Sequence, residues 1–224
     1  MPLMHPAHAL PAGTIALGAG VAGHVNALEL DTQGTTAITA EDLTIAPGVS
    51  PWVSGRVGII GDNEASLTYS GRAFRVGGRH VFPIGPLHLS TEIGAHAVVP
   101  RAREDDDVTK VFGGGGDVPI LMGWTSQAEL YSVWAGPRGG FSLLSGQALP
   151  TLIDGADPLG DAVPFDGTTW YVGGLIGFSI GFRSFHATLE LNLAYSRADG
   201  TFGEAPVSAD YFLLTPGGAF NLTF

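Results

Sequence analysis

The stretch from Thr168 to Ser196 constrains the fold more than any other part of the chain. From Phe185 onward it places apolar residues at every second position, with polar or small residues between them. Successive side chains point to opposite faces of a strand, so this period of two predicts a strand with one apolar and one polar face. The stretch before Gly181 follows the same rule, and residues 181–184 predict a turn between the two arms.

Each arm of this hairpin is longer than a strand of a soluble β-sandwich needs to be. Strands in globular proteins usually have about 5–6 residues, whereas a tilted strand that crosses a bilayer needs about 9–11. Both arms reach the longer length. The hairpin therefore predicts two neighbouring strands of a transmembrane barrel, with a soluble β-sandwich or jelly roll as the alternative.

The composition agrees with a membrane barrel and excludes several other classes. The 224 residues include 34 Gly and no Cys, only 14% are charged, and the formal net charge is −11. The absence of cysteine excludes a disulfide scaffold. A nucleic-acid partner is not expected, because phosphate binding needs clustered Lys and Arg. The sequence has no apolar window of about 18 residues, so no transmembrane helix is predicted.

The same alternation recurs along the chain and predicts one β domain over residues 13–224, after an irregular arm over residues 1–12. Besides the two hairpin arms, the predicted strands cover residues 13–25, 49–60, 64–71, 72–82, 87–98, 118–125, 128–136 and 210–224. About ten strands result, with eight or twelve as alternatives.

The predicted connections alternate between short turns and long loops. The long ones cover residues 26–48, 101–117, 137–167 and 197–209, and the glycines at 113–116 predict a flexible loop tip. Outer-membrane barrels have this asymmetry, with short periplasmic turns and longer external loops. With an even number of strands, both termini are expected on the periplasmic side.

The C-terminal sequence is Ala-Phe-Asn-Leu-Thr-Phe, with Phe220, Leu222 and Phe224 on one face. It resembles the closing strand of bacterial outer-membrane β-barrel proteins, whose final aromatic residue belongs to the assembly signal. The resemblance is to the class of small barrels and names no family, so it carries no functional residues over. It implies an antiparallel up-and-down transmembrane β-barrel in a Gram-negative outer membrane. The implied partners are lipid, lipopolysaccharide and, through the C-terminal strand, the barrel assembly machinery.

In such a barrel the polar face of each strand lines the lumen. The residues predicted there are Arg56, Arg75, Arg79, His88, Glu92, Glu129, Tyr131, His186 and Glu190. An arginine facing hydrocarbon at the midplane would cost about 2–4 kcal/mol, which supports this choice of face. These groups predict either a narrow polar path or a salt-bridged filling of the lumen. Small residues on the first strand leave some space, which the N-terminal segment is a candidate to occupy.

Aromatic residues near the strand ends predict two belts at the membrane interfaces. The residues assigned to these belts are Trp52, Trp124, Trp134, Trp170 and Phe224. Ordinary core packing is the alternative for some of them.

One set of residues has the types that an ester hydrolase needs. His88, Ser90 and Glu92 supply a base, a hydroxyl and an acid. They stand in line on one strand with about 7 Å between successive residues, and they face the lumen, away from lipid. An enzyme is therefore not predicted.

Two further features suggest metal binding only weakly. His5 and His8 have no evident third ligand, and a flexible arm explains them better. The acidic stretches at 104–107 and 154–166 lack the regular spacing of a dedicated calcium site. We therefore expect no metal and no cofactor.

The start of the chain, Met-Pro-Leu-Met-His-Pro, lacks the basic start and apolar core of a signal peptide. If the protein is exported, we expect this chain to be a mature or recombinant form. The first functional hypothesis is a narrow pore or transport-related protein. The second is a non-conducting scaffold that presents its external loops to a partner or surface, and a lipid-modifying enzyme is third.

Overall fold

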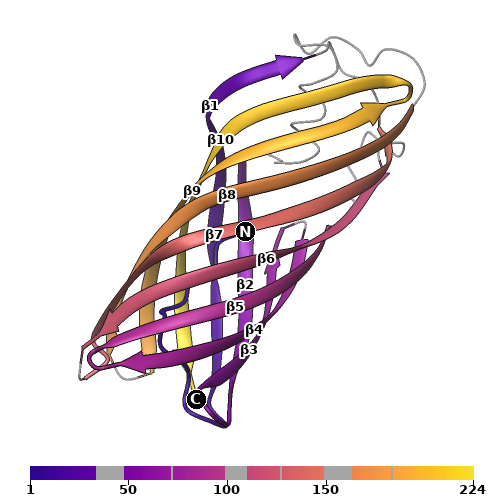
Figure 1. The fold of residues 1–224 in the computed structure, drawn as a ribbon. Helices are drawn as coiled ribbons and strands as arrows, with labels where there is room; N and C mark the ends of the chain where they lie inside the picture. Colours follow the sequence, from indigo (N-terminus) through magenta and orange to yellow (C-terminus); the bar gives the residue numbers. More distant parts are fainter. Residues whose placement is uncertain (34–47, 72, 99–109, 127, 149–162, 183) are drawn as a thin grey trace.

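The computed structural model describes residues 1–33, 48–71, 73–98, 110–126, 128–148, 163–182 and 184–224. Over these residues the chain forms a closed antiparallel barrel of ten strands, in which consecutive strands pair and β1 pairs with β10 (Figure 1). The predicted all-β up-and-down barrel is confirmed. Among the described residues, no helix has the length and apolarity to cross a membrane.

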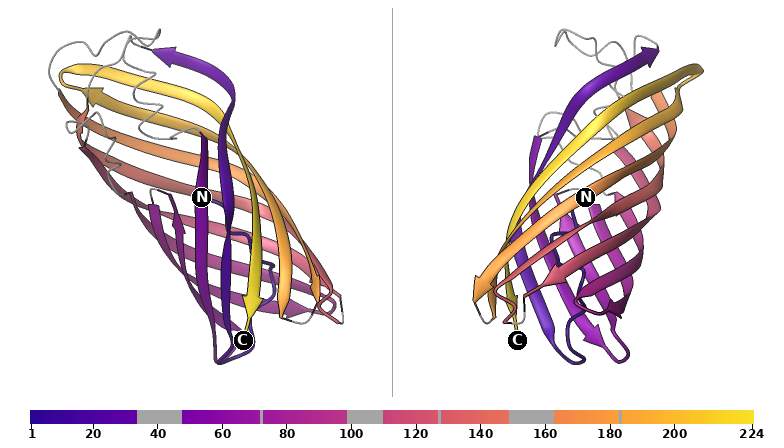
Figure 2. Two further views of the ribbon diagram at one scale, coloured as in Figure 1. Left: turned by 180° about the vertical axis from the view of Figure 1, so that it is seen from behind. Right: turned by 60° about the vertical axis from the view of Figure 1, so that its left-hand side comes forward.

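The strands are β1 (Ile15–Gln33), β2 (Gly48–Ile59), β3 (Asn63–Ser70), β4 (Ala73–Ile84), β5 (Leu87–Val98), β6 (Lys110–Thr125), β7 (Tyr131–Ala148), β8 (Val163–Phe182), β9 (Phe185–Phe202) and β10 (Ala205–Thr223). Those from β2 to β5 have 8–12 residues, whereas those from β6 to β10 have 16–20. One side of the barrel is therefore taller than the other (Figure 2).

The two ends of the barrel differ in their connections. At one end, the short-turn end, short turns join β2 to β3, β4 to β5, β6 to β7 and β8 to β9. At the opposite, long-connection end, β1, β5 and β7 lead into residues 34–47, 99–109 and 149–162, which lie outside the described residues. The acidic stretch 104–107 and most of 154–166 belong to these segments.

Several strands continue into segments predicted as loops. Residues 113–116 pair within β6 and are not a loop tip, and β7 continues past Pro137. β9 and β10 cover most of the predicted loop 197–209 and meet at a tight turn, where Gly203 has a φ of +60°. Continuous pairing with neighbouring strands overrides the local loop preference of Gly and Pro at these positions.

The barrel exterior is apolar and the interior polar, the reverse of a soluble protein. Ile93, Ile176 and Leu189 are 75%, 60% and 65% exposed, while Arg75 and Glu190 are 2% and 4% exposed. A barrel surrounded by lipid has this distribution, because its outward side chains meet hydrocarbon and its inward ones meet each other. The soluble sandwich alternative is therefore wrong.

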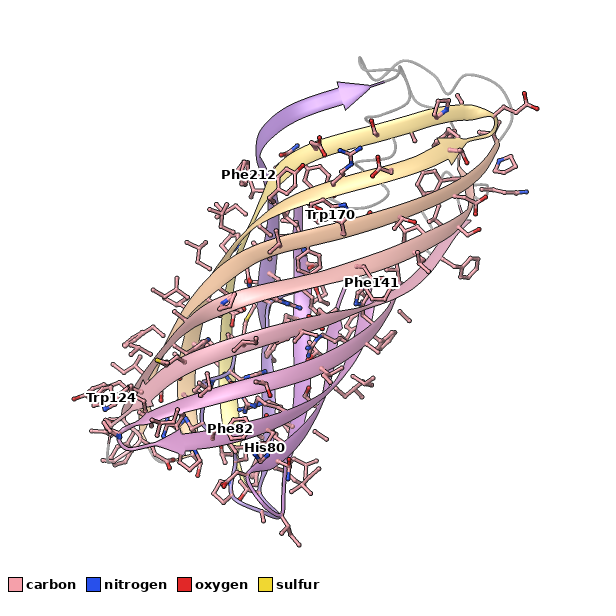
Figure 3. All side chains as sticks on the ribbon, viewed as in Figure 1. His80, Phe82, Trp124, Phe141, Trp170 and Phe212 are labelled. Carbon is pink, nitrogen blue, oxygen red and sulfur yellow. The ribbon has the colours of Figure 1, made fainter. Side chains whose placement is uncertain are left out.

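Aromatic side chains gather toward both ends of the exterior. Figure 3 shows Phe141, Trp170 and Phe212 toward the long-connection end, and His80, Phe82 and Trp124 toward the short-turn end. The ring centroids of Trp170 and Tyr195 are 5.5 Å apart. This arrangement is typical of the two interfacial belts of a membrane barrel.

Candidate functional site: the barrel lumen

Residues 1–12, which we call the plug segment, fold back into the barrel instead of extending away from it. The chain reverses at Gly13, whose φ of +83° lies in the left-handed region that glycine adopts without steric cost. Leu3, Met4 and His5 are at most 3% exposed. In Figures 1 and 2 the N-terminus accordingly lies at mid-height within the barrel, and the C-terminus lies at the short-turn end.

Carboxylates of the barrel wall bind the backbone N–H groups of the plug segment. Leu3 N and Met4 N each donate to a different oxygen of Glu190 at 2.8 Å. Leu10 N donates to Glu64 Oε2 at 3.1 Å. The plug segment has no regular secondary structure, so these side chains satisfy buried donors that would otherwise lack partners. Hydrogen bonds to charged groups contribute about 1.5–3 kcal/mol each.

Donors on the wall bind the carbonyl groups of the plug segment. Arg79 donates to Pro6 O at 2.6 Å and to His8 O at 3.0 Å. Trp52 Nε1 donates to Pro2 O at 3.2 Å, and Arg138 donates to the carbonyl of Met1. The wall therefore binds both N–H and C=O groups of the plug segment, and it binds both ends of the peptide group between Pro2 and Leu3, which fixes the position of the segment along the lumen.

The same wall residues form a buried network of ion pairs. Glu64 lies 3.3 Å from Arg56 and 2.8 Å from Arg79. Asp117 pairs with Arg75 at 2.9 Å and also with Arg138, and Arg75 pairs in addition with Glu92. The members are Arg56, Arg75, Arg79, Arg138, Glu64, Glu92 and Asp117, each at most 6% exposed. Charges this deeply buried persist only when they are paired.

The plug segment lies in the lumen and is not one of the membrane-spanning strands. Both of its histidine rings are neutral at pH 7, because their pKa values are lowered. Burial, reinforced by Arg79 and Arg56, lowers the pKa of His5 well below its ordinary value. Burial and the same arginines lower the pKa of His8 to about 3. His5 Nε2 lies 3.6 Å from Glu92 Oε2, but a neutral ring makes this a dipolar contact and not an ion pair.

The structure places five of the nine predicted lumen residues deep in the interior, namely Arg56, Arg75, Arg79, Glu92 and Glu190. His88 and His186 are half-buried and lie near the short-turn end. His88 is 6.1 Å from the ring of His8, and His186 Nε2 is 2.8 Å from the carbonyl oxygen of Glu129.

The other two predictions for the lumen are wrong. Glu129 is exposed in the β6–β7 turn, where its φ is +54°. Tyr131 is 43% exposed on the outer face and lies beside Trp124, with ring centroids 5.6 Å apart. The strand phase of β7 explains the error, because Ser132 and Trp134 face inward and Tyr131 therefore has the outward phase.

Two of the five predicted interface aromatics also need correction. Trp52 and Trp134 are 1% and 2% exposed and lie inside the lumen. Glycine at a neighbouring inward position makes room for Trp134, since a Cβ built on Gly177 would overlap its indole ring. Trp170 and Phe224 are 41% and 71% exposed on the outside.

Sequence reasoning missed three members of the ion network. Asp117 and Arg138 fall in the predicted loops 101–117 and 137–167, and Glu64 is the first residue of the predicted strand 64–71, where no role is assigned to it. Each continues the inward phase of its strand: Asp117 stands two residues before Pro119, and Arg138 four residues after Trp134. Extending the alternation past Gly and Pro would have found them.

A cavity of about 210 Å³ lies beyond the plug segment, toward the long-connection end, and we call it the chamber. Met1, Arg75 and Arg138 line the side nearest the plug segment. Further along, the lining includes a hydrogen-bonded pair, His96 Nε2 and Ser142 Oγ at 2.8 Å. The chamber is therefore bounded on one side by the charged network.

An apolar cluster lies inside the barrel beyond the chamber. Its buried members are Val111, Leu144, Phe165, Phe202 and Val207, from β6 to β10. Leu144 also lines the chamber, so cavity and cluster are continuous. The interior thus changes from charged to apolar along its length.

Ser90 and Glu92, two of the three residues that supply the types of an ester hydrolase, are buried in the described part of the lumen. Ser90 is 1% exposed, and the Glu92 carboxylate is bonded to Arg75. Within the described ranges, no three His, Asp or Glu side chains are grouped so as to hold a metal ion.

No protein-family model and no curated protein sequence matches the chain. Among solved structures it is similar to the outer membrane protein OprG from Pseudomonas aeruginosa, with a TM-score of 0.49, 10% identity and coverage of 96% of this chain and 98% of that one. It is also similar to Neisserial surface protein A, at a TM-score of 0.35, 12% identity and coverage of 94% and 96%. The Pseudomonas putida toluene transporter TodX has a TM-score of 0.33 and 9% identity, with coverage of 91% and 68%. This chain is a transmembrane β-barrel.

Proposed function

We propose that this chain is a bacterial outer-membrane transport protein whose narrow lumen is closed by its own plug segment. One observation carries the proposal: the wall holds the plug segment through side chains such as Glu190 and Arg79, while the strands, over the residues that the structure describes, pair only with each other. The plug segment can therefore leave the lumen without breaking a single strand–strand hydrogen bond.

A second candidate is the non-conducting scaffold. The buried ion pairs of Asp117 and Glu64 favour it, because they remain in the lumen even when the plug segment is absent. In that case the loops at the long-connection end, and not the lumen, would carry the function.

A reversible covalent lock distinguishes the two candidates. A Cβ built on Gly123 would lie 2.7 Å from Ala7 Cβ, and Cβ atoms joined by a disulfide are about 3.5–4.5 Å apart. The double variant A7C/G123C therefore needs residue 7 to move back by about 1 Å and Val133 O, 2.9 Å from the built Cβ, to move slightly as well. The chain has no other cysteine. Oxidation ties the plug segment to β6, and a reductant frees it.

The measurement is ion conductance in planar bilayers, with oxidised and reduced protein from one preparation. Transport through the lumen predicts unit conductance after reduction and its loss after oxidation. The single variants A7C and G123C, which cannot form the lock, should conduct equally under both conditions. Silence of the unlocked and reduced proteins would reject the proposal in favour of the scaffold.

A further inference from the structure

The walls of the chamber combine apolar side chains with neutral hydrogen-bonding groups. Val98, Leu144 and Leu213 supply apolar surface. Ser142 of β7 and Thr169 of β8 are direct cross-strand partners, and both line the chamber. Their hydroxyl groups lie between the charged network on one side and the apolar cluster on the other.

The Thr169 hydroxyl is a buried group beside the chamber that lacks a hydrogen-bond partner among the described residues. Thr169 itself is 9% exposed. Buried hydroxyl groups in folded proteins almost always have a partner. Because Thr169 lines the chamber, a change of its χ1 rotamer turns the hydroxyl toward a molecule bound there, which then supplies the partner. Tyr171 lies two residues further along β8 and also lines the chamber, with its hydroxyl 3.5 Å from Asp117.

The two arginines that line the chamber, Arg75 and Arg138, already have charged or carbonyl partners. Arg75 is shared between Asp117 and Glu92, and Arg138 binds Asp117 and the carbonyl of Met1. An anionic ligand would have to displace a buried carboxylate from its arginine, which leaves a charge unpaired at high cost. The charge pattern therefore favours an uncharged ligand.

The size of the chamber limits the ligand further. A dry cavity of about 150 Å³ accepts one benzene ring, and this chamber has about 210 Å³. A fused bicyclic ring, or one ring with a short substituent, matches that volume.

We propose that the chamber is a binding site for a small uncharged molecule with an apolar ring and one hydrogen-bonding group that pairs with Thr169. This rests on the proposed transport function and deepens it, because it names the class of molecule that enters the lumen. Leu144 and the apolar cluster form the approach from the long-connection end, and the plug segment closes the chamber on the other side.

Matched ligands and variants test the site. Indole carries an N–H group, indene has nearly the same shape without it, and benzoate adds a negative charge. Thr169→Val removes the hydroxyl at constant shape. Thr168→Val makes the same change at the adjacent exposed position of β8 and serves as the control. Ala194→Phe introduces a ring into the chamber, which Ala194 lines.

The measurement is NMR titration of methyl-labelled protein in nanodiscs, comparing Val98 and Leu144 with the lipid-facing Leu189. Indole should shift the chamber methyl signals saturably, whereas signals of Leu189 report only partitioning into lipid. Thr169→Val should weaken indole binding about five- to tenfold and leave indene unchanged. Ala194→Phe should abolish binding of both.

Three results would overturn the site: chamber signals that shift no more than those of Leu189, equal weakening of indole and indene by Thr169→Val, or tighter binding of benzoate than of indole. The titration needs no conductance and keeps the plug segment in place. A protein that binds indole but stays silent in bilayers would reject the transport function alone.

Discussion

On the plug side of the chamber, wall residues such as Glu190 and Arg79 bind a separate peptide through charged hydrogen bonds. On the other side, the same barrel turns Phe165 and Val207 inward. On the plug side, which is the charged half of the lumen, stability depends on the geometry and pairing of the charged groups, because each group that loses its partner is left buried and charged. In the apolar half, which is the apolar cluster, stability depends on how much apolar surface is buried, since the burial of apolar surface is not directional. The two halves should therefore respond very differently to equally small substitutions.

Removing one charge from the plug side should have the largest effect. Asp117→Asn leaves Arg75 and Arg138 without their shared carboxylate, and breaking a buried pair costs about 3–5 kcal/mol of stability. The measurement is urea unfolding in lipid vesicles. Asp166→Asn, at an exposed position where Asp166 accepts a hydrogen bond from Ser145, should stay within about 0.5 kcal/mol. Equal effects of the two changes would contradict the comparison.

Acid should release the plug segment without changing the apolar half. The pKa of His5 and of His8 is lowered when the segment is docked, so the released form takes up protons first as pH falls below about 6.5. Docking is strongest above that pH and weakens by about 1.4 kcal/mol per pH unit for each histidine. For His8 this trend ends near the docked pKa of about 3.

Deuterium uptake by residues 1–12, referenced to a free peptide of the same sequence, measures this release. The ratio to the free peptide should rise by about tenfold per pH unit and per histidine. His5→Gln with His8→Gln should flatten the profile. A profile that is already flat in the parent protein would show that protonation of these histidines does not control docking.

A substitution in the apolar half should have the smallest effect. Val207→Ala removes two carbon atoms from the apolar cluster, which should cost about 1.5–2.5 kcal/mol in the same unfolding measurement. Docking of the plug segment should not change, as judged by its deuterium uptake. A cost as large as that of Asp117→Asn would show that both halves are equally demanding.

Alternation alone predicts much of the fold, because a barrel in lipid needs opposite chemistry on its two faces. It places Arg75 and Glu92 correctly within a closed barrel. The predicted strands end too early at Gly113 and Pro137, because Gly and Pro are typical of loops. Both residues lie inside long paired strands. The pairing that keeps these positions extended is tertiary, and the local preference of Gly and Pro for loops masks the alternation that continues past them.

The chemical meaning of an inward aromatic is harder to predict. Trp134 is apolar, so composition assigns it to lipid, yet it packs against Leu3 and Ala7 of the plug segment. Only the presence of that segment makes an apolar residue suitable for the lumen at this depth. Sequence patterns report which face a residue occupies better than they report what the face contacts.

The sharing of Asp117 between two arginines also has a consequence for how sequences of this kind can diverge. A lone change at Asp117 or Arg138 leaves an unmatched charge in the barrel, whereas a joint change to well-packed apolar residues of similar volume can be neutral or stabilising. We therefore expect positions 117 and 138 to change together in related sequences. At positions in the apolar cluster such as Val207, residues can be exchanged one at a time.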